Sequence, residues 1–331
     1  MRGFKTIKKQ PTQPQSQPQY EVADVLNKLG SKLEDLGLNS WQLRTLFALK
    51  KCRTSALGGH IDACDECGNI SISYNSCRNR HCPKCQGRNR EDWIQTRETE
   101  LLPVPYFHVV FTLPEVLNKT ALHEPKMLYD ILFESAWETL QTFGKNKNLQ
   151  MGMIAVLHTW GQNLSLHPHL HCIVPGGGVD ENGAWKNIKN DGKFLFSVKA
   201  LSKVFRAKFC EKLKANLKDK FNENQENEYE KIRQSLWEKP WVVYAKKPFG
   251  SPKSVVEYLG RYTHKIAISN GRIRGIDDKT VTFDYKDYRQ KGIKKQMVLS
   301  HEEFIRRFAM HILPKRFVKI RHYGFLSSTW K

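Results

Sequence analysis

The spacing of hydrophobic residues predicts where the chain forms helices. From residue 20 to about residue 51, apolar side chains recur every three or four positions, which is typical of amphipathic helices packed against a core. The same spacing recurs in four later segments, residues 91–101, 115–144, 198–234 and 304–312. The segment at 198–234 is rich in Lys, Glu and Asn, so we expect helices there with one face in solvent.

Between these segments, short β-branched and aromatic runs predict strands. They lie at residues 106–113, 153–160, 166–174, 241–245, 266–269, 281–285 and 296–299. The turn Gly161-Gln162-Asn163 joins two of these runs, which therefore predict an antiparallel pair. Interspersed helices and antiparallel strands indicate an α+β fold.

The second strand of this pair carries histidines at alternate positions. His167, His169 and His171 precede an apolar run that ends in Gly176-Gly177-Gly178, where we expect a tight turn. Residues i, i+2 and i+4 of a strand share one face. Neutral imidazoles on a rigid strand are suitable ligands for a divalent metal, so this face is a candidate metal site.

The charge balance indicates a polyanionic partner. The chain has 331 residues, enough for about two domains, with 54 Lys and Arg against 33 Asp and Glu and a formal net charge of +21. Such an excess favours nucleic acid, although a basic protein without this role remains an alternative. Residues 1–19 are polar and basic and predict a disordered arm.

No apolar run reaches the ~20 residues of a membrane span, and the N-terminus lacks the apolar core of a signal peptide. We therefore expect a cytoplasmic protein, associated with the nucleoid through DNA. Cysteines in that compartment are reduced, so clustered cysteines predict metal ligands before disulfides.

Eight potential zinc ligands are concentrated between residues 52 and 86. Cys64–Cys67 and Cys82–Cys85 form two Cys-x2-Cys pairs, separated by residues 68–81. Two such pairs can complete a tetrahedral zinc site, so we predict a structural zinc on these four cysteines.

The remaining potential ligands leave two alternatives open. The remaining residues are Cys52, His60, Cys77 and His81. They could form a second zinc site, or the cysteines could be small buried residues and the histidines surface residues. Basic side chains among the ligands are candidate phosphate contacts, or simply solvated charges: Arg78, Arg80, Lys84, Arg88 and Arg90.

A predicted helix after residue 250 carries two tyrosines. Ser251 and Pro252 are helix-start signals, and Tyr258 and Tyr262, at i and i+4, share one face. A pair at this spacing is ordinarily core packing, so its meaning depends on the histidine segment.

In combination, these motifs resemble a known family. His169-Leu170-His171 matches a His-hydrophobe-His (HUH) motif, and Tyr258-Leu-Gly-Arg-Tyr262 matches a two-tyrosine helix. The run from Cys77 to Cys85 is similar to an N-terminal zinc-binding domain. All three occur in transposases of the insertion sequence 91 family, and the resemblance covers about residues 20–330.

The resemblance implies an endonuclease and strand transferase for single-stranded DNA, acting in rolling-circle transposition. Tyr258 and Tyr262 are then the nucleophiles that form a 5′-phosphotyrosine, and His169 and His171 hold Mg²⁺ or Mn²⁺. A third ligand is expected, with Gln162 favoured over His167 and then His158. Lys265 is a weak candidate for assisting the tyrosine or contacting DNA.

The resemblance also implies an organisation and a set of partners. Residues 20–102 form a helical, zinc-binding and DNA-binding domain, and residues 103–331 an HUH domain with a central antiparallel sheet flanked by helices. The partners are single-stranded DNA at transposon ends and target, and a host helicase, because the sequence contains no nucleotide-binding phosphate loop. The alternatives are a non-catalytic zinc-ribbon DNA-binding protein and a hydrolase of small substrates.

Overall fold

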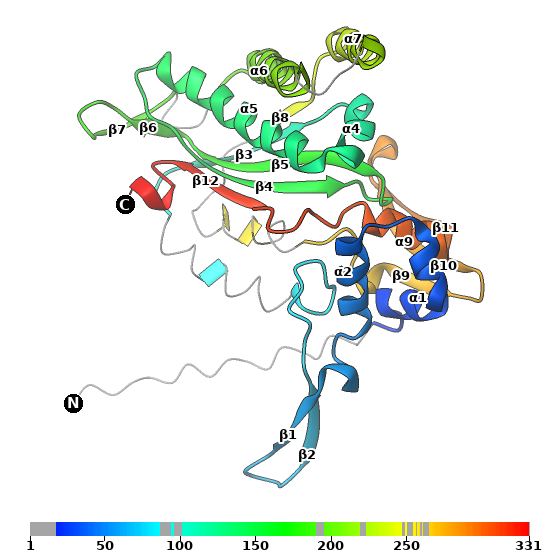
Figure 1. Ribbon diagram of the computed structural model, residues 1–331. Coiled ribbons are helices and arrows are strands. Elements are labelled where there is room, and N and C mark those ends of the chain that lie inside the picture. Colours follow the sequence, from blue (N-terminus) through cyan, green and yellow to red (C-terminus); the bar gives the residue numbers. More distant parts are fainter. Residues whose placement is uncertain are drawn as a thin grey trace, which may run out of the picture.

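A five-stranded antiparallel sheet lies at the centre of the computed structural model, in the order β12–β4–β5–β3–β8 (Figure 1). Its strands are β3 (Tyr106–Thr112), β4 (Gly152–Trp160), β5 (Leu166–Pro175), β8 (Val243–Ala245) and β12 (Ile320–Gly324). The antiparallel pair expected from the sequence is β4 and β5, and β3 and β8 also match predicted runs. The α+β prediction is confirmed, although no strand was predicted at the position of β12.

The structure describes residues 18–86, 94–95, 101–189, 195–218, 223–246, 249, 254–255, 257–258, 260 and 265–330. Most of the predicted N-terminal arm, most of the predicted helix at 91–101 and much of the helix expected at 251–265 lie outside these residues. Within the described residues, no helix is both long and apolar enough to cross a membrane.

Helices cover one face of the central sheet (Figure 1). They are α4 (Asn118–His123), α5 (Pro125–Lys145), α6 (Val198–Lys218) and α7 (Glu223–Glu238), preceded by a 3-10 turn at Glu115–Leu117. The single helical segment expected at 115–144 is interrupted, because Pro125 cannot continue a preceding helix and instead occupies the first turn of α5.

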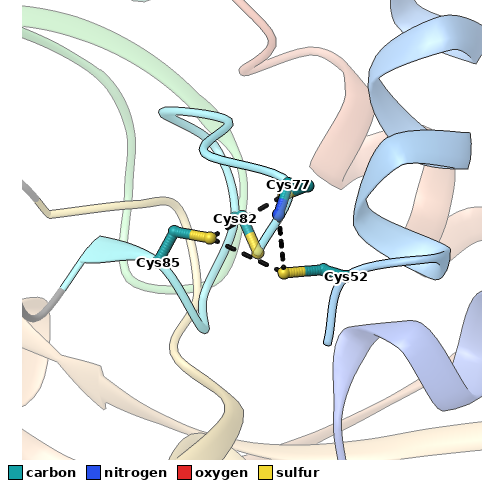
Figure 2. Close-up of side chains that lie close together, drawn as sticks. All are labelled: Cys52, Cys77, Cys82 and Cys85. Atoms are coloured by element: carbon teal, nitrogen blue, oxygen red, sulfur yellow. Dashed lines mark hydrogen bonds between the residues drawn. The ribbon is translucent and has the colours of Figure 1, made fainter. Parts of the chain in front are cut away.

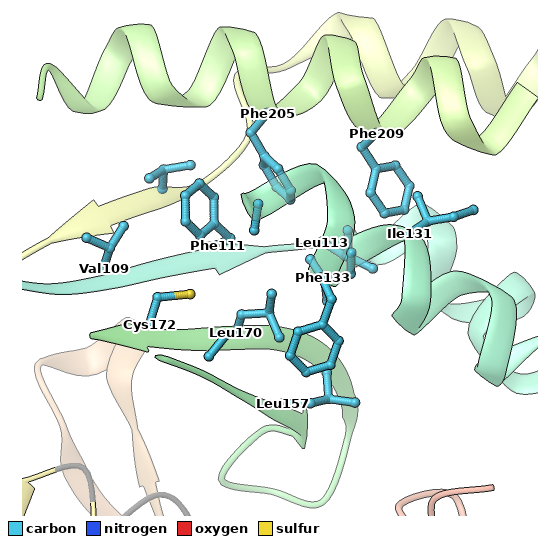
Figure 3. Packing of buried hydrophobic residues seen from close by; sticks show 14 of the residues in the cluster. Val109, Phe111, Leu113, Ile131, Phe133, Leu157, Leu170, Cys172, Phe205 and Phe209 are labelled. Carbon is cyan, nitrogen blue, oxygen red and sulfur yellow. The ribbon is translucent and has the colours of Figure 1, made fainter. Parts of the chain in front are cut away.

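The first hydrophobic core lies between the sheet and these helices (Figure 3). Phe111 of β3 and Leu170 of β5 point towards the helices, as the two-residue alternation of a strand requires. Phe133 of α5 and the α6 residues Phe205 and Phe209 fill the space above them. The opposite face of β3, β4 and β5 is thereby left for other residues.

The glycine run after β5 forms a strand and not the predicted tight turn. β6 (Gly177–Val179) pairs with β7 (Trp185–Asn187). A Cβ on Gly177 would lie 2.4 Å from the Lys186 carbonyl oxygen, and one on Gly178 would lie 2.5 Å from the Gln150 carbonyl oxygen. The glycines therefore permit close backbone approach.

A second, three-stranded sheet is formed by β9 (Ile273–Ile276), β10 (Thr280–Asp287) and β11 (Ile293–Ser300), and α9 (His301–Ala309) follows it. Short 3-10 turns lie at Asn270–Arg272 and Tyr288–Gln290. The strand predicted at 266–269 is wrong. Ala267 and Ile268 are buried in irregular backbone, and the next buried residue, Asn270, accepts a hydrogen bond of 3.1 Å from the Val22 N–H through its side chain.

The N-terminal helices share a second hydrophobic core with this sheet and α9. They are α1 (Val22–Leu29), a 3-10 helix (Gly30–Leu36) and α2 (Ser40–Lys50). Leu26 and Leu33 belong to the same buried cluster as Phe304 and Phe308 of α9. The boundary predicted at residue 102 thus separates segments of sequence but not hydrophobic cores.

A hairpin projects from this part of the molecule (Figure 1). A 3-10 turn (Ser55–Leu57) leads into β1 (Gly59–Ala63), which pairs with β2 (Ile70–Tyr74). Both strands are largely exposed. After the hairpin, the chain is again in contact with the rest of the protein at Cys77, whose N–H donates to Cys52 Sγ. A last 3-10 turn (Ser328–Trp330) lies near the C-terminus.

Candidate active site and metal centres

The face of the sheet opposite α5 and α6 carries a cluster of histidines. In β5, Leu170 and Cys172 are buried against the helices, so His169 and His171 point to the other side. His158 of β4 is the direct cross-strand partner of His169. Residues paired across an antiparallel ladder share a face, so all three imidazoles converge.

The three imidazoles have the geometry of a metal site. One ring nitrogen from each of His158, His169 and His171 lies within 4.8 Å of those from the other two. The Nε2 atoms of His169 and His171 are 3.2 Å apart. His158 and His171 are buried, whereas His169 is only partly buried, so the site is reached through His169. Such a set fits a divalent cation with positions left for other ligands.

Hydrogen bonding orients His169 for this role. Its Nδ1–H donates to the His167 carbonyl oxygen at 2.6 Å, so in the neutral ring Nε2 carries the lone pair. The pKa of His169 is lowered to about 4, mainly by burial and also by the nearby charges of His108 and Lys265, although the hydrogen bond to the His167 carbonyl opposes the shift. Burial also lowers the pKa of His171 well below its usual value. Both rings are therefore neutral near pH 7, as ligands must be.

Tyr258 lies beside this cluster. Its hydroxyl oxygen is 3.3 Å from Nδ1 of His108, a buried β3 residue, and the two rings meet edge to face with centroids 5.0 Å apart. Lys246 Nζ lies 5.2 Å from the centre of the tyrosine ring. The structure thus brings together Tyr258 and the histidine motif, which the sequence connected only through a resemblance. Tyr262 lies outside the described residues.

A second cluster of ligands consists of four cysteines, Cys52, Cys77, Cys82 and Cys85 (Figure 2). The Sγ atoms of Cys52 and Cys85 are 3.6 Å apart, and those of Cys77 and Cys85 are 3.8 Å apart. Four sulfurs about 2.3 Å from a tetrahedral zinc ion would be separated by about 3.8 Å. The four cysteines therefore fit a closed structural zinc site.

The environment of the thiols also favours a cation. Burial raises the pKa of Cys52 to about 11, whereas a hydrogen bond from the Cys82 thiol is the main factor that lowers the pKa of Cys77 to about 5. Four thiols in such proximity cannot all ionise without a positive charge among them. Zinc would supply that charge and bind all four as thiolates.

Comparison with known proteins gives a concordant result over both parts of the chain. Residues 152–331 match the family described as "Putative transposase", and residues 24–113 match the "Transposase zinc-binding domain". A protein of Sinorhizobium fredii (strain NBRC 101917 / NGR234) named "Putative transposase y4qJ" is 44% identical, over 94% of this chain and 81% of its own. The transposase for insertion sequence element IS801 of Pseudomonas savastanoi pv. phaseolicola is 29% identical, over 89% of this chain and 73% of its own.

The chain is a transposase of the insertion sequence 91 family. The family resemblance expected from the sequence is confirmed, and so is the expectation that the transposase carries a zinc-binding domain.

The structure corrects the predicted grouping of the zinc ligands in the transposase. Cys64 and Cys67 are exposed at the turn of the β1–β2 hairpin and do not join Cys82 and Cys85. The hairpin pairs from Gly59 with Tyr74 to Ala63 with Ile70. Strands of five residues each place the turn roughly 17 Å from the base of the hairpin, where Cys77 lies.

The second predicted set, Cys52, His60, Cys77 and His81, is also divided. Its cysteines complete the Cys82–Cys85 pair, while His60 is exposed on β1, with Nε2 3.7 Å from an Asp62 carboxylate oxygen. His81 has a structural role instead, because its Nε2 accepts a hydrogen bond of 3.3 Å from the Leu313 N–H.

The structure places His158, which the sequence ranked behind Gln162 and His167, beside His169 and His171 as the third histidine of the cluster. Gln162 lies in the turn beyond Trp160, where its backbone carbonyl accepts a hydrogen bond from Arg272. The exposed His167 contributes its carbonyl oxygen to His169.

Two of the basic residues proposed for DNA contact have partners within the transposase. Arg80 donates to the carbonyl oxygens of Phe317 and Pro314 at 2.5 and 3.1 Å, and Lys84 Nζ lies 2.5 Å from a Glu21 carboxylate oxygen. Arg78 is exposed, and Arg88 and Arg90 lie outside the described residues. Lys265 is close enough to the histidines for its charge to lower the pKa of His169 and His171.

Proposed function

We propose that this transposase cuts and rejoins single-stranded DNA through a 5′-phosphotyrosine, in transposition by a rolling-circle route. The observation that carries the proposal is the position of Tyr258, whose hydroxyl lies beside the histidine cluster on the open face of the sheet. A nucleophile next to a cation site is the arrangement that phosphoryl transfer requires. The formal charge of +21 favours the polyanionic substrate.

His158, His169 and His171 are the residues that would hold the catalytic Mg²⁺ or Mn²⁺. Imidazole nitrogens prefer Mn²⁺ to Mg²⁺ in affinity, so abundance decides which ion is used in cells. When bound there, the cation offsets the negative charge that develops on the scissile phosphate.

The tyrosine step balances without an energy cofactor. The Tyr258 oxygen forms a bond to phosphorus, the bond from phosphorus to the 3′ oxygen breaks, and the tyrosine proton is transferred to that leaving oxygen. The products are a 5′-phosphotyrosine and a free 3′-OH, and the reverse reaction rejoins the strand. Tyr262, four residues further along the sequence, is proposed to hold or attack a second DNA end.

The substrate is proposed to be single-stranded DNA at the ends of the mobile element and at its target. The sequence contains no phosphate loop for a nucleotide-driven motor, so separation of the strands is assigned to a helicase of the host. The zinc module is proposed to contact DNA through exposed basic residues such as Arg78.

The test uses single-stranded oligonucleotides that carry the ends of the element encoding this chain, with Mn²⁺ or Mg²⁺. We expect covalent protein–DNA adducts on denaturing gels, fewer adducts with Tyr258→Phe and none with the double variant Tyr258→Phe, Tyr262→Phe. Tyr288→Phe, at a 70% exposed tyrosine away from the cluster, is the matched control. Binding of DNA without adducts under either metal would instead support a non-catalytic DNA-binding protein.

A further inference from the structure

His108 connects a proposed metal ligand with the proposed nucleophile. This β3 residue is 3% exposed, and its ring is nearly parallel to that of His171, with a centroid distance of 5.0 Å and an interplanar angle of 11°. His108 Nε2 lies 2.8 Å from His171 Nδ1, and His108 Nδ1 lies 3.3 Å from the Tyr258 hydroxyl oxygen. The HUH motif does not include this residue.

The hydrogen bonds form a continuous chain in which each neutral ring carries one proton. The chain starts at the His167 carbonyl oxygen, which fixes the proton of His169 on Nδ1 and leaves a lone pair on Nε2. The chain then continues through His171 and His108 to the tyrosine. His171 and His108 can each hold the proton on either ring nitrogen. The positions of these two protons therefore decide whether the hydrogen bonds run from Tyr258 towards His169 or from His171 towards Tyr258.

A cation at the histidine cluster selects one direction. If His169 and His171 held a cation through their Nε2 lone pairs, the proton of His171 would be on Nδ1 and would be donated to His108 Nε2. The proton of His108 is then on Nδ1 and is donated to the Tyr258 oxygen. Without a cation, His171 can donate through Nε2 to His169, and the whole chain can run the other way, with the tyrosine hydroxyl donating to His108.

We propose that His108 is a positioning residue, which transmits occupation of the His169–His171 pair to the orientation of the Tyr258 hydroxyl. In the cation-bound arrangement the tyrosine oxygen would accept a hydrogen bond from His108, and this bond would stabilise the negative charge that the oxygen carries as it loses its proton. This role rests on the proposed function, and it predicts that Tyr258 depends on His108 more than Tyr262 does.

The experiment separates the two tyrosines. The parent, His108→Gln and His108→Ala are each prepared in the Tyr262→Phe background, where only Tyr258 can attack, and in the Tyr258→Phe background, where only Tyr262 can attack. The readouts are the initial rate of adduct formation on the element-end oligonucleotide, the Mn²⁺ concentration that gives half of the maximal rate, and the Mn²⁺ dissociation constant measured by titration calorimetry without DNA. His322→Gln, on β12 of the same sheet, is the matched control, and thermal unfolding identifies any variant that does not fold.

We expect His108→Ala to lower the Tyr258 rate by about 10- to 100-fold and the Tyr262 rate by less than about threefold, with a higher Mn²⁺ requirement in both backgrounds. His108→Gln keeps a donor and an acceptor but cannot shift a proton between them, so we expect an intermediate Tyr258 rate. Equal losses in both backgrounds, or no loss in either, would overturn the role of His108 alone. Absence of adducts from both parent backgrounds would overturn the proposed function, and the role of His108 with it.

Discussion

The cysteine cluster and the histidine cluster differ in how the chain assembles them. The four cysteines come from two connecting segments, with Cys52 after α2 and the other three after β2, and three of the four are buried. The three histidines come from two adjacent strands within residues 158–171, and His169 remains partly exposed. Four thiolates fill a tetrahedral site, whereas three imidazoles leave coordination positions for a substrate. The first cluster is therefore suited to stability and the second to chemistry.

The largest expected effect tests the closed cluster. We expect Cys82→Ser to abolish zinc binding and the folding of the second core, because structural zinc contributes about 10 to 16 kcal/mol in small zinc-binding peptides, as much as an entire domain's stability. The measurements are zinc content and thermal unfolding of the purified protein.

Cys64→Ser is the matched control, because this cysteine belongs to the other Cys-x2-Cys pair and is exposed. It should keep its zinc and change the free energy of unfolding by less than about 0.5 kcal/mol. Loss of zinc in both variants to the same extent would show that the four-cysteine grouping in Figure 2 is wrong.

A smaller effect tests the open cluster. We expect His158→Ala to lower the rate of adduct formation by on the order of 100-fold and to raise the Mn²⁺ requirement, since it removes one of three cation ligands. Gln162→Ala, in the turn beyond the strand, should change the rate by less than about threefold. Zinc content should be unaffected in both variants. A reversal of the two effects would restore Gln162 as the third ligand.

The smallest effect concerns His311, a buried histidine that belongs to neither cluster. Its ring bonds the Thr159 hydroxyl and the Leu164 carbonyl, each at 3.2 Å. Burial lowers its pKa to about 4, below the usual value near 6.5, so the unfolded chain takes up the proton first as the pH falls. Stability present above pH 6.5 is therefore lost progressively towards pH 4.

Between pH 7.5 and pH 5.5 this residue should reduce the free energy of unfolding by about 1.3 kcal/mol. The measurement is denaturant unfolding at several pH values, with His311→Gln as the comparison, because glutamine can donate and accept but does not titrate. An identical pH slope in the parent and the variant would rule out the contribution of His311.

Much of the sheet face that carries the histidines could be predicted from the sequence, because it depends on local periodicity. The alternation in β5 identified His169 and His171, and the adjoining turn identified β4 as the partner strand. The position of His158 next to His169 was harder to predict, because the register of the pair shifts between His158 and Trp160. Turn composition alone does not specify such a bulge.

The remaining features depend on contacts between distant residues. Cys52 lies next to Cys85 because the β1–β2 hairpin carries Cys64 and Cys67 away from the cluster. His108 and Tyr258 lie 150 positions apart, and no spacing rule relates them. Apolar and polar residues alternate before Cys64 and after Cys67, and this alternation predicts the hairpin. The two equally spaced cysteine pairs instead suggested that all four cysteines bind one zinc ion.

The second core also has a consequence for the order in which the protein is completed. The hydrogen bond from Val22 to Asn270 spans 248 positions of sequence. The N-terminal helices, which begin at Val22, pack against strands that the ribosome synthesises after Asn270. At about 5 to 20 residues per second, the ribosome needs roughly 12 to 50 s to supply those strands. The first helices to be synthesised are therefore among the last to be buried, and a prematurely terminated chain would leave their apolar faces exposed to proteases and aggregation.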